Sequence, residues 1–80
     1  MLSVNFYTKE HCLLCEEALT IVEILQSMYS FQINICDIHE RDDWLEQYFL
    51  LIPVVEINGT KLTGNQLTYP IIEETIKAHL

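Results

Sequence analysis

Two cysteines separated by two residues, in the run His11-Cys12-Leu13-Leu14-Cys15, are the side chains of this sequence best suited to chemistry. They lie between a segment with the alternation of a strand and a segment with helical periodicity, so we expect them on the first turn of a helix. Residues three apart on a helix face the same side, and two thiols at this separation can form a disulfide or exchange with the disulfide of another molecule. A helix N-terminus stabilises negative charge, so a thiol there ionises more easily to the reactive thiolate. The motif therefore predicts thiol–disulfide chemistry.

The pattern of apolar residues predicts strands and helices that alternate around this motif. Strict alternation at Leu2, Val4 and Phe6 indicates a first strand, and helical spacing then continues from Cys12 almost to Phe31. A strand, a helix and a second strand in one small sheet imply a parallel pair. The predicted order is β-α-β-α-β-β-α, with strands at 1–7, 31–36, 54–57 and 61–63, and helices at 13–30, 42–49 and 66–80.

The connections near the C-terminus carry their own signals. Asn58-Gly59 is a strong tight-turn pair and predicts a hairpin between the last two strands. Tyr69-Pro70 fits the first turn of the last helix, where a missing amide hydrogen costs little. That helix is expected to bury, in part, the apolar residues Leu67, Ile71, Ile72, Ile76 and Leu80.

Composition limits the class of protein. Four basic against twelve acidic residues give a net charge of −8, which argues against nucleic acid and anionic membranes as partners. Eighty residues predict a single domain over 1–80, and no apolar run approaches a membrane span. The N-terminus lacks the basic flank and apolar block of a signal peptide. Three cysteines are too few for a disulfide-stapled secreted scaffold. We therefore expect a monomer in the reducing cytoplasm.

Four short segments are weak signals alone and specific in combination. They are Tyr7–Cys12, the Cys-x-x-Cys motif Cys12–Cys15, Ile52–Val54, and the stretch from Ile57 through Gly64. Together with the order of elements, these segments resemble the glutaredoxin family, and most of all the small glutaredoxin-like proteins of bacteria. The resemblance covers nearly the whole chain. It implies an α/β, thioredoxin-like fold of the short glutaredoxin type with a four-stranded mixed sheet.

The resemblance implies catalytic roles for three residues. Cys12 corresponds to the attacking thiolate, and Cys15 corresponds to the resolving thiol that displaces the product. The expected positions agree, because Cys12 is nearer the helix end and solvent. Lys9 matches a family lysine that assists thiolate formation and contacts the carboxylate of glutathione. His11 adds a second positive charge beside the nucleophile when it is protonated.

A substrate site around the cysteines is also implied. Pro53 matches the cis-proline of the family, and a cis bond there would leave the backbone of Ile52 free to pair with an extended peptide beside Cys12. The expected substrate-binding residues are Lys9, His11, Leu13, Ile52, Pro53, Gly64 and Asn65.

The sequence departs from the family pattern at two places. Leu13 and Leu14 stand where glutaredoxins usually have proline and an aromatic residue. The segment Thr63–Leu67 lacks both acidic residues that bind the amino end of glutathione in the family. The amide side chains of Asn65 and Gln66 can substitute for them, and a protein disulfide is the alternative substrate.

These observations predict a thiol–disulfide oxidoreductase that reduces disulfides or glutathione mixed disulfides. The expected reductant is glutathione, with no tightly bound cofactor. The first alternative is a thioredoxin-like enzyme that reduces protein disulfides without glutathione and receives electrons from a flavin disulfide reductase. Two other classes stay open, a metal or iron–sulfur module and a redox-inert adaptor that keeps the fold.

The metal alternative has a spacing of its own. Cys12, Cys15, Cys36 and His39 imitate the ligand spacing of a zinc ribbon. Because Cys12 and Cys15 begin a long helix rather than a knuckle loop, we expect no metal site. Cys36 is instead expected to be a small buried apolar residue on the second strand.

Overall fold

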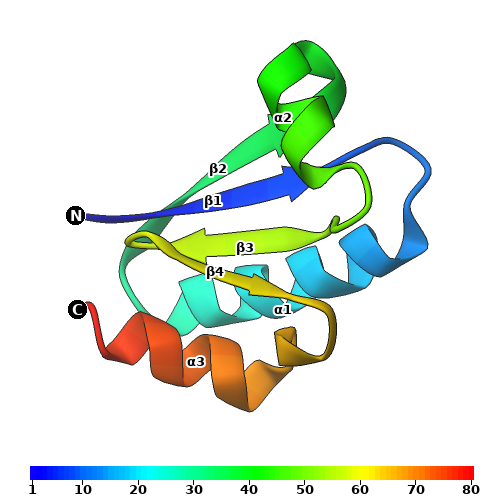
Figure 1. The fold of residues 1–80 in the computed structure, drawn as a ribbon. Coiled ribbons are helices and arrows are strands. Elements are labelled where there is room, and N and C mark those ends of the chain that lie inside the picture. The colour runs from blue at the N-terminus through cyan, green and yellow to red at the C-terminus, as the bar shows by residue number, and fades with distance from the viewer.

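A computed structural model of residues 1–80 has the order of strands and helices that the sequence predicts (Figure 1). The strands are β1 (Leu2–Thr8), β2 (Phe31–Asp37), β3 (Val54–Ile57) and β4 (Thr60–Thr63), and the helices are α1 (Leu13–Met28), α2 (Asp42–Tyr48) and α3 (Tyr69–Lys77). Two short 3-10 turns follow β2 and β4, η1 (Ile38–Glu40) and η2 (Gly64–Gln66). None of the three α-helices combines the length and the apolar character that a membrane crossing requires.

The four strands form one mixed sheet in the order β2-β1-β3-β4. β1 and β2 run parallel, with Phe6 beside Ile35, while β1–β3 and β3–β4 are antiparallel. The hairpin between β3 and β4 turns at Asn58 and Gly59, whose φ values of 48° and 86° are those of a two-residue turn with both central residues left-handed. The predicted parallel pair and hairpin are both confirmed.

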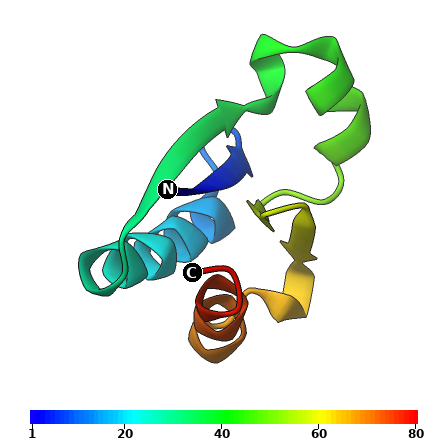
Figure 2. The same cartoon turned by 90° about the vertical axis from the view of Figure 1, so that its left-hand side faces the viewer.

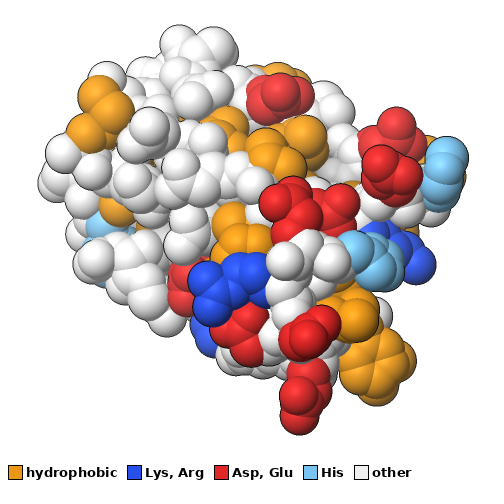
Figure 3. Space-filling view, turned by 90° about the horizontal axis from the view of Figure 1, so that it is seen from above, with side chains coloured by type: hydrophobic (Ala, Val, Ile, Leu, Met, Phe, Trp, Pro, Cys, Tyr) orange, Lys and Arg blue, Asp and Glu red, His pale blue; other side chains and the backbone are white.

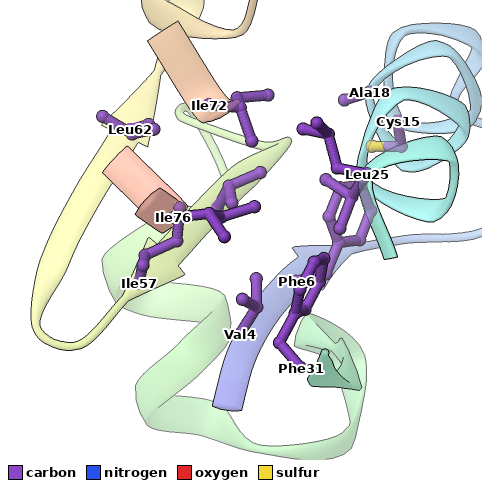
Figure 4. Packing of buried hydrophobic residues seen from close by; sticks show 12 residues of the cluster. Val4, Phe6, Cys15, Ala18, Leu25, Phe31, Ile57, Leu62, Ile72 and Ile76 are labelled. Atoms are coloured by element: carbon purple, nitrogen blue, oxygen red, sulfur yellow. The ribbon is translucent and has the colours of Figure 1, made fainter. Parts of the chain in front are cut away.

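One face of the sheet is covered by α1 and α3, which lie side by side (Figures 1 and 2). Between the helices and this face lies a cluster of twelve buried residues, which Figure 4 shows from close by. Val4 and Phe6 enter the cluster from alternate positions of β1, and Ala18 and Leu25 enter it from α1. Helical spacing of these α1 residues is what seats the helix on the sheet.

The opposite face of β1 holds a second, smaller cluster under α2. Its five buried residues include Tyr7, Tyr48 and Val54, with Trp44 packed against them. The rings of Tyr7 and Tyr48 stack with centroids 4.2 Å apart, and Trp44 meets Tyr7 edge-on at 5.7 Å. These contacts fix α2 against the end of β1 from which the chain continues toward Cys12.

Tyr7 also joins a polar row on the same face of the sheet. Its hydroxyl donates to Glu56 Oε1 at 3.2 Å, and Asn5 Nδ2 donates to the same oxygen at 2.9 Å. Asn34 Nδ2 in turn donates to Asn5 Oδ1 at 3.0 Å, so the row crosses three strands in register. Burial, followed by the contact with Tyr48 and the negative charge of Glu56, raises the pKa of Tyr7 above its usual value.

The last helix begins later than the sequence predicts. Residues 64–66 form the turn η2, closed by a hydrogen bond of 3.1 Å from the Thr63 N–H to Gln66 Oε1. Leu67 then leaves the helical region, and the Thr68 side chain caps α3 by accepting from the Ile71 N–H at 3.4 Å. The helix therefore starts at Tyr69, with Pro70 in its first turn as expected.

Fewer apolar residues of the last helix and its end are buried than the sequence predicts. Ile72 and Ile76 are fully buried, whereas Ile71 is 40% exposed and Leu80, beyond the end of the helix, is 62% exposed. The two buried isoleucines are four residues apart and share one face of the helix, while Ile71 lies on the side turned to solvent.

This difference makes a matched pair of variants informative. We expect Ile72→Ala to lower the free energy of unfolding by about 2–5 kcal/mol, because it leaves a cavity in the main cluster. Ile71→Ala should change it by less than about 0.5 kcal/mol, since the side chain is partly solvated and alanine favours helix. Urea denaturation of both variants measures the two values. Equal losses would show that α3 packs differently from the structure.

Candidate active site

Cys12 occupies the N-cap position of α1. Its backbone is extended, with φ −123° and ψ 102°, and its carbonyl accepts the Glu16 N–H at 3.1 Å to close the first helical turn. Its Sγ accepts the Cys15 N–H at 3.2 Å, in the way that a serine or aspartate cap accepts an amide hydrogen. The sulfur therefore lies where unsatisfied amide groups and the helix dipole favour negative charge.

Cys12 and Cys15 are joined by a disulfide, with Cα atoms 5.2 Å apart. This Cα separation lies within the usual range for the bond, so the backbone of the first turn accommodates it. Cys15 is only 3% exposed and belongs to the main buried cluster, where Figure 4 shows its sulfur on the core side of α1. Cys12 is partly exposed at the edge of that cluster. An incoming sulfur can thus approach Cys12 and not Cys15.

The loop before Cys12 turns the chain from β1 into α1. His11 has a left-handed backbone, with φ 55°, a conformation in which histidine is enriched among residues other than glycine. Lys9, Glu10 and His11 line a polar hollow of about 440 Å³ together with Asp37 and His39. His39 Nδ1 lies 3.6 Å from Asp37 Oδ1 in this hollow. The two cationic candidates, Lys9 and His11, therefore share one hollow at the loop that precedes Cys12.

The peptide bond between Ile52 and Pro53 is cis, as expected from the resemblance. The sequence predicts that the backbone of Ile52 is free to pair with a peptide, but only part of it is free. Its N–H donates to the Tyr48 carbonyl at 3.1 Å, so the turn after α2 already uses this donor. The hydrogen bonds outside helices and strands include none to the Ile52 carbonyl, and that oxygen is the group left for an incoming peptide.

An apolar groove of about 370 Å³ runs alongside the Cys-x-x-Cys turn. One wall is α1, from Leu14 to Ile21, and the facing wall is the segment Leu50–Pro53. Gly64 and Leu67 complete it, and seven of the ten lining residues are apolar. Exposed leucines extend this surface, since Leu14 is 65% exposed and Leu50 is 81% exposed. The groove can accommodate an apolar segment next to Cys12.

The predicted substrate-binding residues divide between these two depressions. Ile52, Pro53 and Gly64 line the apolar groove, whereas Lys9 and His11 line the polar hollow. Leu13 and Asn65 are exposed and line neither. Their roles in binding stay predictions.

Most of the groove was not predicted from the sequence. On α1 the lining residues not predicted are Glu17, Ala18 and Ile21, which follow Leu14 at three, four and seven residues. This spacing marks one helical face and was a signal in the sequence. Leu50 and Leu51 gave no such signal, because their position depends on how α2 packs on β1.

Cys36 is buried, as expected, in the second cluster beside Tyr7. Burial, with smaller contributions from Glu56 and Glu40, raises the pKa of its thiol. Its Sγ lies 3.6 Å from the Asn34 carbonyl oxygen. A buried, protonated thiol is a poor nucleophile, so Cys36 is a packing residue.

The zinc-ribbon spacing does not correspond to a cluster in space. No three histidine, cysteine, aspartate or glutamate side chains are grouped so that they could hold a metal ion. Cys15 packs in the main cluster and Cys36 in the cluster on the other face of the sheet. The structure therefore gives no support to a site built from Cys12, Cys15, Cys36 and His39.

The fold and the cysteine pair together define a class of protein. A small α/β domain whose first helix begins with a Cys-x-x-Cys disulfide is typical of the thioredoxin fold and suggests a function in thiol–disulfide redox chemistry. Residues 3–80 match the family model described as a glutaredoxin-like domain (DUF836). The chain belongs to this glutaredoxin-like family.

Solved structures share this fold at low sequence identity. A structure described as that of a malarial protein superposes with a TM-score of 0.72 at 17% identity, over 100% of this chain and 98% of that chain. A mutant thioredoxin from Halobacterium salinarum NRC-1 superposes with a TM-score of 0.76 at 16% identity, over 96% of this chain and 73% of that one. The predicted thioredoxin-like fold is confirmed. A comparison with curated proteins finds no match.

Differences in exposure among the three cysteines lead to a labelling test. In the reduced protein we expect iodoacetamide to modify Cys12 at least about tenfold faster than Cys36, because Cys12 lies at a helix N-terminus with access to solvent. Mass spectrometry of digested time points gives the rate at each cysteine. In denaturant the rates should converge. Faster native labelling of Cys36 would contradict the assignment of Cys12 as the reactive thiol.

Proposed function

We propose that this protein is a thiol–disulfide oxidoreductase that reduces disulfides with the dithiol of Cys12 and Cys15. The observation that carries the proposal is the Cys12–Cys15 disulfide at the N-terminus of α1, with one sulfur partly exposed and the other buried. A purely structural disulfide does not require an exposed sulfur at a helix N-terminus beside an apolar groove. The arrangement supports a bond that opens and closes during exchange.

Each reduction transfers two electrons from the dithiol to the substrate. The Cys12 thiolate attacks one sulfur of the substrate disulfide, the substrate S–S bond breaks, and the leaving thiolate takes a proton from solvent. Cys15 then loses its proton and attacks Cys12 Sγ, which breaks the mixed disulfide and releases the second substrate thiol. The product is the Cys12–Cys15 disulfide seen in the structure. Two molecules of glutathione, or a flavin disulfide reductase, would restore the dithiol.

Lys9 and His11 are the positive groups that would assist this cycle. Lys9 lies three residues before Cys12 and takes part in neither ion pair of the structure. A free cation near the nucleophile stabilises its thiolate, and a protonated His11 adds to this effect. The residues share the polar hollow, so both act from the solvent side of the nucleophile's loop.

The apolar groove favours a protein disulfide over glutathione as the substrate. Glutathione carries two carboxylates, and the groove offers them no lysine, arginine or histidine. Among the charged side chains on the face seen in Figure 3, acidic ones are the commonest, and the net charge of −8 repels an anionic ligand from the molecule as a whole. An apolar segment of a protein meets neither obstacle. Glutathione remains the expected reductant. As a reductant it forms the same mixed disulfide with Cys12 as a glutathionylated substrate would, so the groove lowers its affinity and does not exclude it.

Turnover of two substrates by single-cysteine variants tests this function. We expect the wild type to reduce a protein disulfide, Cys12→Ser to fall to the uncatalysed rate, and Cys15→Ser to accumulate a mixed disulfide with the substrate. Cys36→Ser is the matched control and should keep the wild-type rate, because its thiol is buried away from the exchange. Free-thiol release and mass spectrometry measure turnover and the trapped intermediate.

A glutathionylated peptide is the second substrate. We expect the wild type to reduce it less efficiently than the protein disulfide, as judged by kcat/KM. A clear preference for the glutathionylated peptide would overturn the choice of substrate while leaving the dithiol cycle intact. Full activity of Cys12→Ser on both substrates would overturn the proposed function itself.

A further inference from the structure

One charged side chain lies in the otherwise apolar and uncharged wall of the groove. Glu17 shares a face of α1 with Leu14, Ala18 and Ile21, and it is the only ionisable residue among the ten that line the groove. Glu17 is itself exposed, so its carboxylate is hydrated in the free protein. It is also the one charge that a segment lying in the groove would meet.

Glu17 has no partner of its own. The two ion pairs of the structure join Asp37 to His39 and Asp43 to Arg41, and no side-chain hydrogen bond reaches the Glu17 carboxylate. Of the glutamate carboxylates, only those of Glu56 and Glu73 accept side-chain hydrogen bonds, from Tyr7 and from the Tyr29 hydroxyl at 2.8 Å. Glu17 differs from the other unpaired glutamates in lining the groove. The carboxylate of Glu17 is thus exposed, unpaired and available at the side of the groove.

We propose that Glu17 determines substrate specificity by binding a lysine or arginine of the partner protein whose disulfide is reduced. The inference rests on the proposed function and adds the substrate class, which is an extended, cysteine-bearing protein segment with apolar residues and one basic residue near the cysteine. The apolar side chains of this segment cover Leu14 and the Leu50–Pro53 wall, while its cation pairs with Glu17. Charge complementarity with a chain of net charge −8 favours the same partner.

Helix geometry sets the place of the basic residue. Glu17 lies five residues beyond Cys12, which is about 7.5 Å along the axis of α1 at 1.5 Å per residue. An extended peptide advances about 3.3 Å per residue. A segment whose cysteine reaches Cys12 and which follows the groove therefore brings its second or third residue from that cysteine alongside Glu17.

Peptides that differ in one residue test this inference. Each peptide of the first set contains two cysteines joined by a disulfide and flanked by leucines. The peptides of this set differ at one position, two or three residues before or after a cysteine, which is Lys, Gln or Glu. A second set has serine in place of both cysteines, so that binding is measured without any exchange. kcat/KM is measured with the first set, and affinity is measured by fluorescence anisotropy with the second.

We expect the wild type to favour the best-placed Lys peptide over its Gln counterpart by about two- to fivefold in both measurements, as for an exposed ion pair. The preference should shrink at high salt. Glu17→Gln should abolish it, and Glu17→Lys should reverse it in favour of the Glu peptide.

Glu16→Gln is the matched control, because Glu16 precedes Glu17 on α1, is exposed, and does not line the groove. Glu16→Gln removes one negative charge at a position even closer in sequence to Cys12. If loss of a nearby charge acted only by changing the stability of the Cys12 thiolate, Glu16→Gln would therefore show the same effect as Glu17→Gln. We expect Glu16→Gln to keep the wild-type preference for Lys. Equal affinities of the Lys, Gln and Glu peptides at every position, or equal effects of Glu16→Gln and Glu17→Gln, would overturn the inference. Absence of turnover with the disulfide set would contradict the proposed function, whereas the binding set decides the role of Glu17 independently.

Discussion

The first turn of α1, pressed against the sheet, is the contact on which the rest of the site depends. Cys15 is held in the same buried cluster as Phe6 and Val22, while Cys12 remains at its edge as the N-cap. Close packing allows little rotation of the helix, since any rotation would expose Cys15 or open a void beside it. The same turn presents the Cys15 N–H to Cys12 Sγ. Core packing thus decides that Cys12 Sγ, and not Cys15 Sγ, is accessible to solvent. It also orients the Cys15 N–H, which would stabilise a Cys12 thiolate in the reduced protein.

A second contact, the stack of Tyr7 on Tyr48, positions what lies around that turn. Tyr7 ends the buried part of β1 just before the loop that leads to Cys12. The Tyr48 carbonyl accepts the N–H groups of both Leu51 and Ile52, at 2.8 and 3.1 Å, and so shapes the segment that faces α1 across the groove. One aromatic pair therefore connects the loop that leads to Cys12 with the opposite wall of the groove. This explains how a chain of eighty residues keeps a defined site at an exposed edge.

Local patterns predicted the order of elements, the hairpin at Asn58 and the place of Cys12 and Cys15 at the start of α1, because each depends on residues close in sequence. The start of α3 was missed because a hydrogen bond from the Thr63 backbone N–H to the side-chain oxygen of Gln66 closes a separate turn first. The apolar groove was missed because its walls come from α1 and from the segment after α2, which only tertiary packing brings together. Glu17 was missed although its spacing from Leu14 and Ile21 marks one face of α1. That this face lines a groove depends on the facing segment Leu50–Pro53, which only the folded chain brings there.

The reduction potential of the Cys12–Cys15 pair is the most direct measure of whether this bond is a working part of the protein. The protein is equilibrated with thiol–disulfide buffers of graded potential, and its oxidised fraction is read by mass spectrometry after alkylation. We expect one two-electron transition between about −120 and −270 mV, as in redox-active dithiols, which disappears when Cys12 or Cys15 is replaced by serine and persists in Cys36→Ser. A potential below about −300 mV, typical of structural disulfides, or a transition that requires Cys36, would contradict the assignment of this pair as the redox centre.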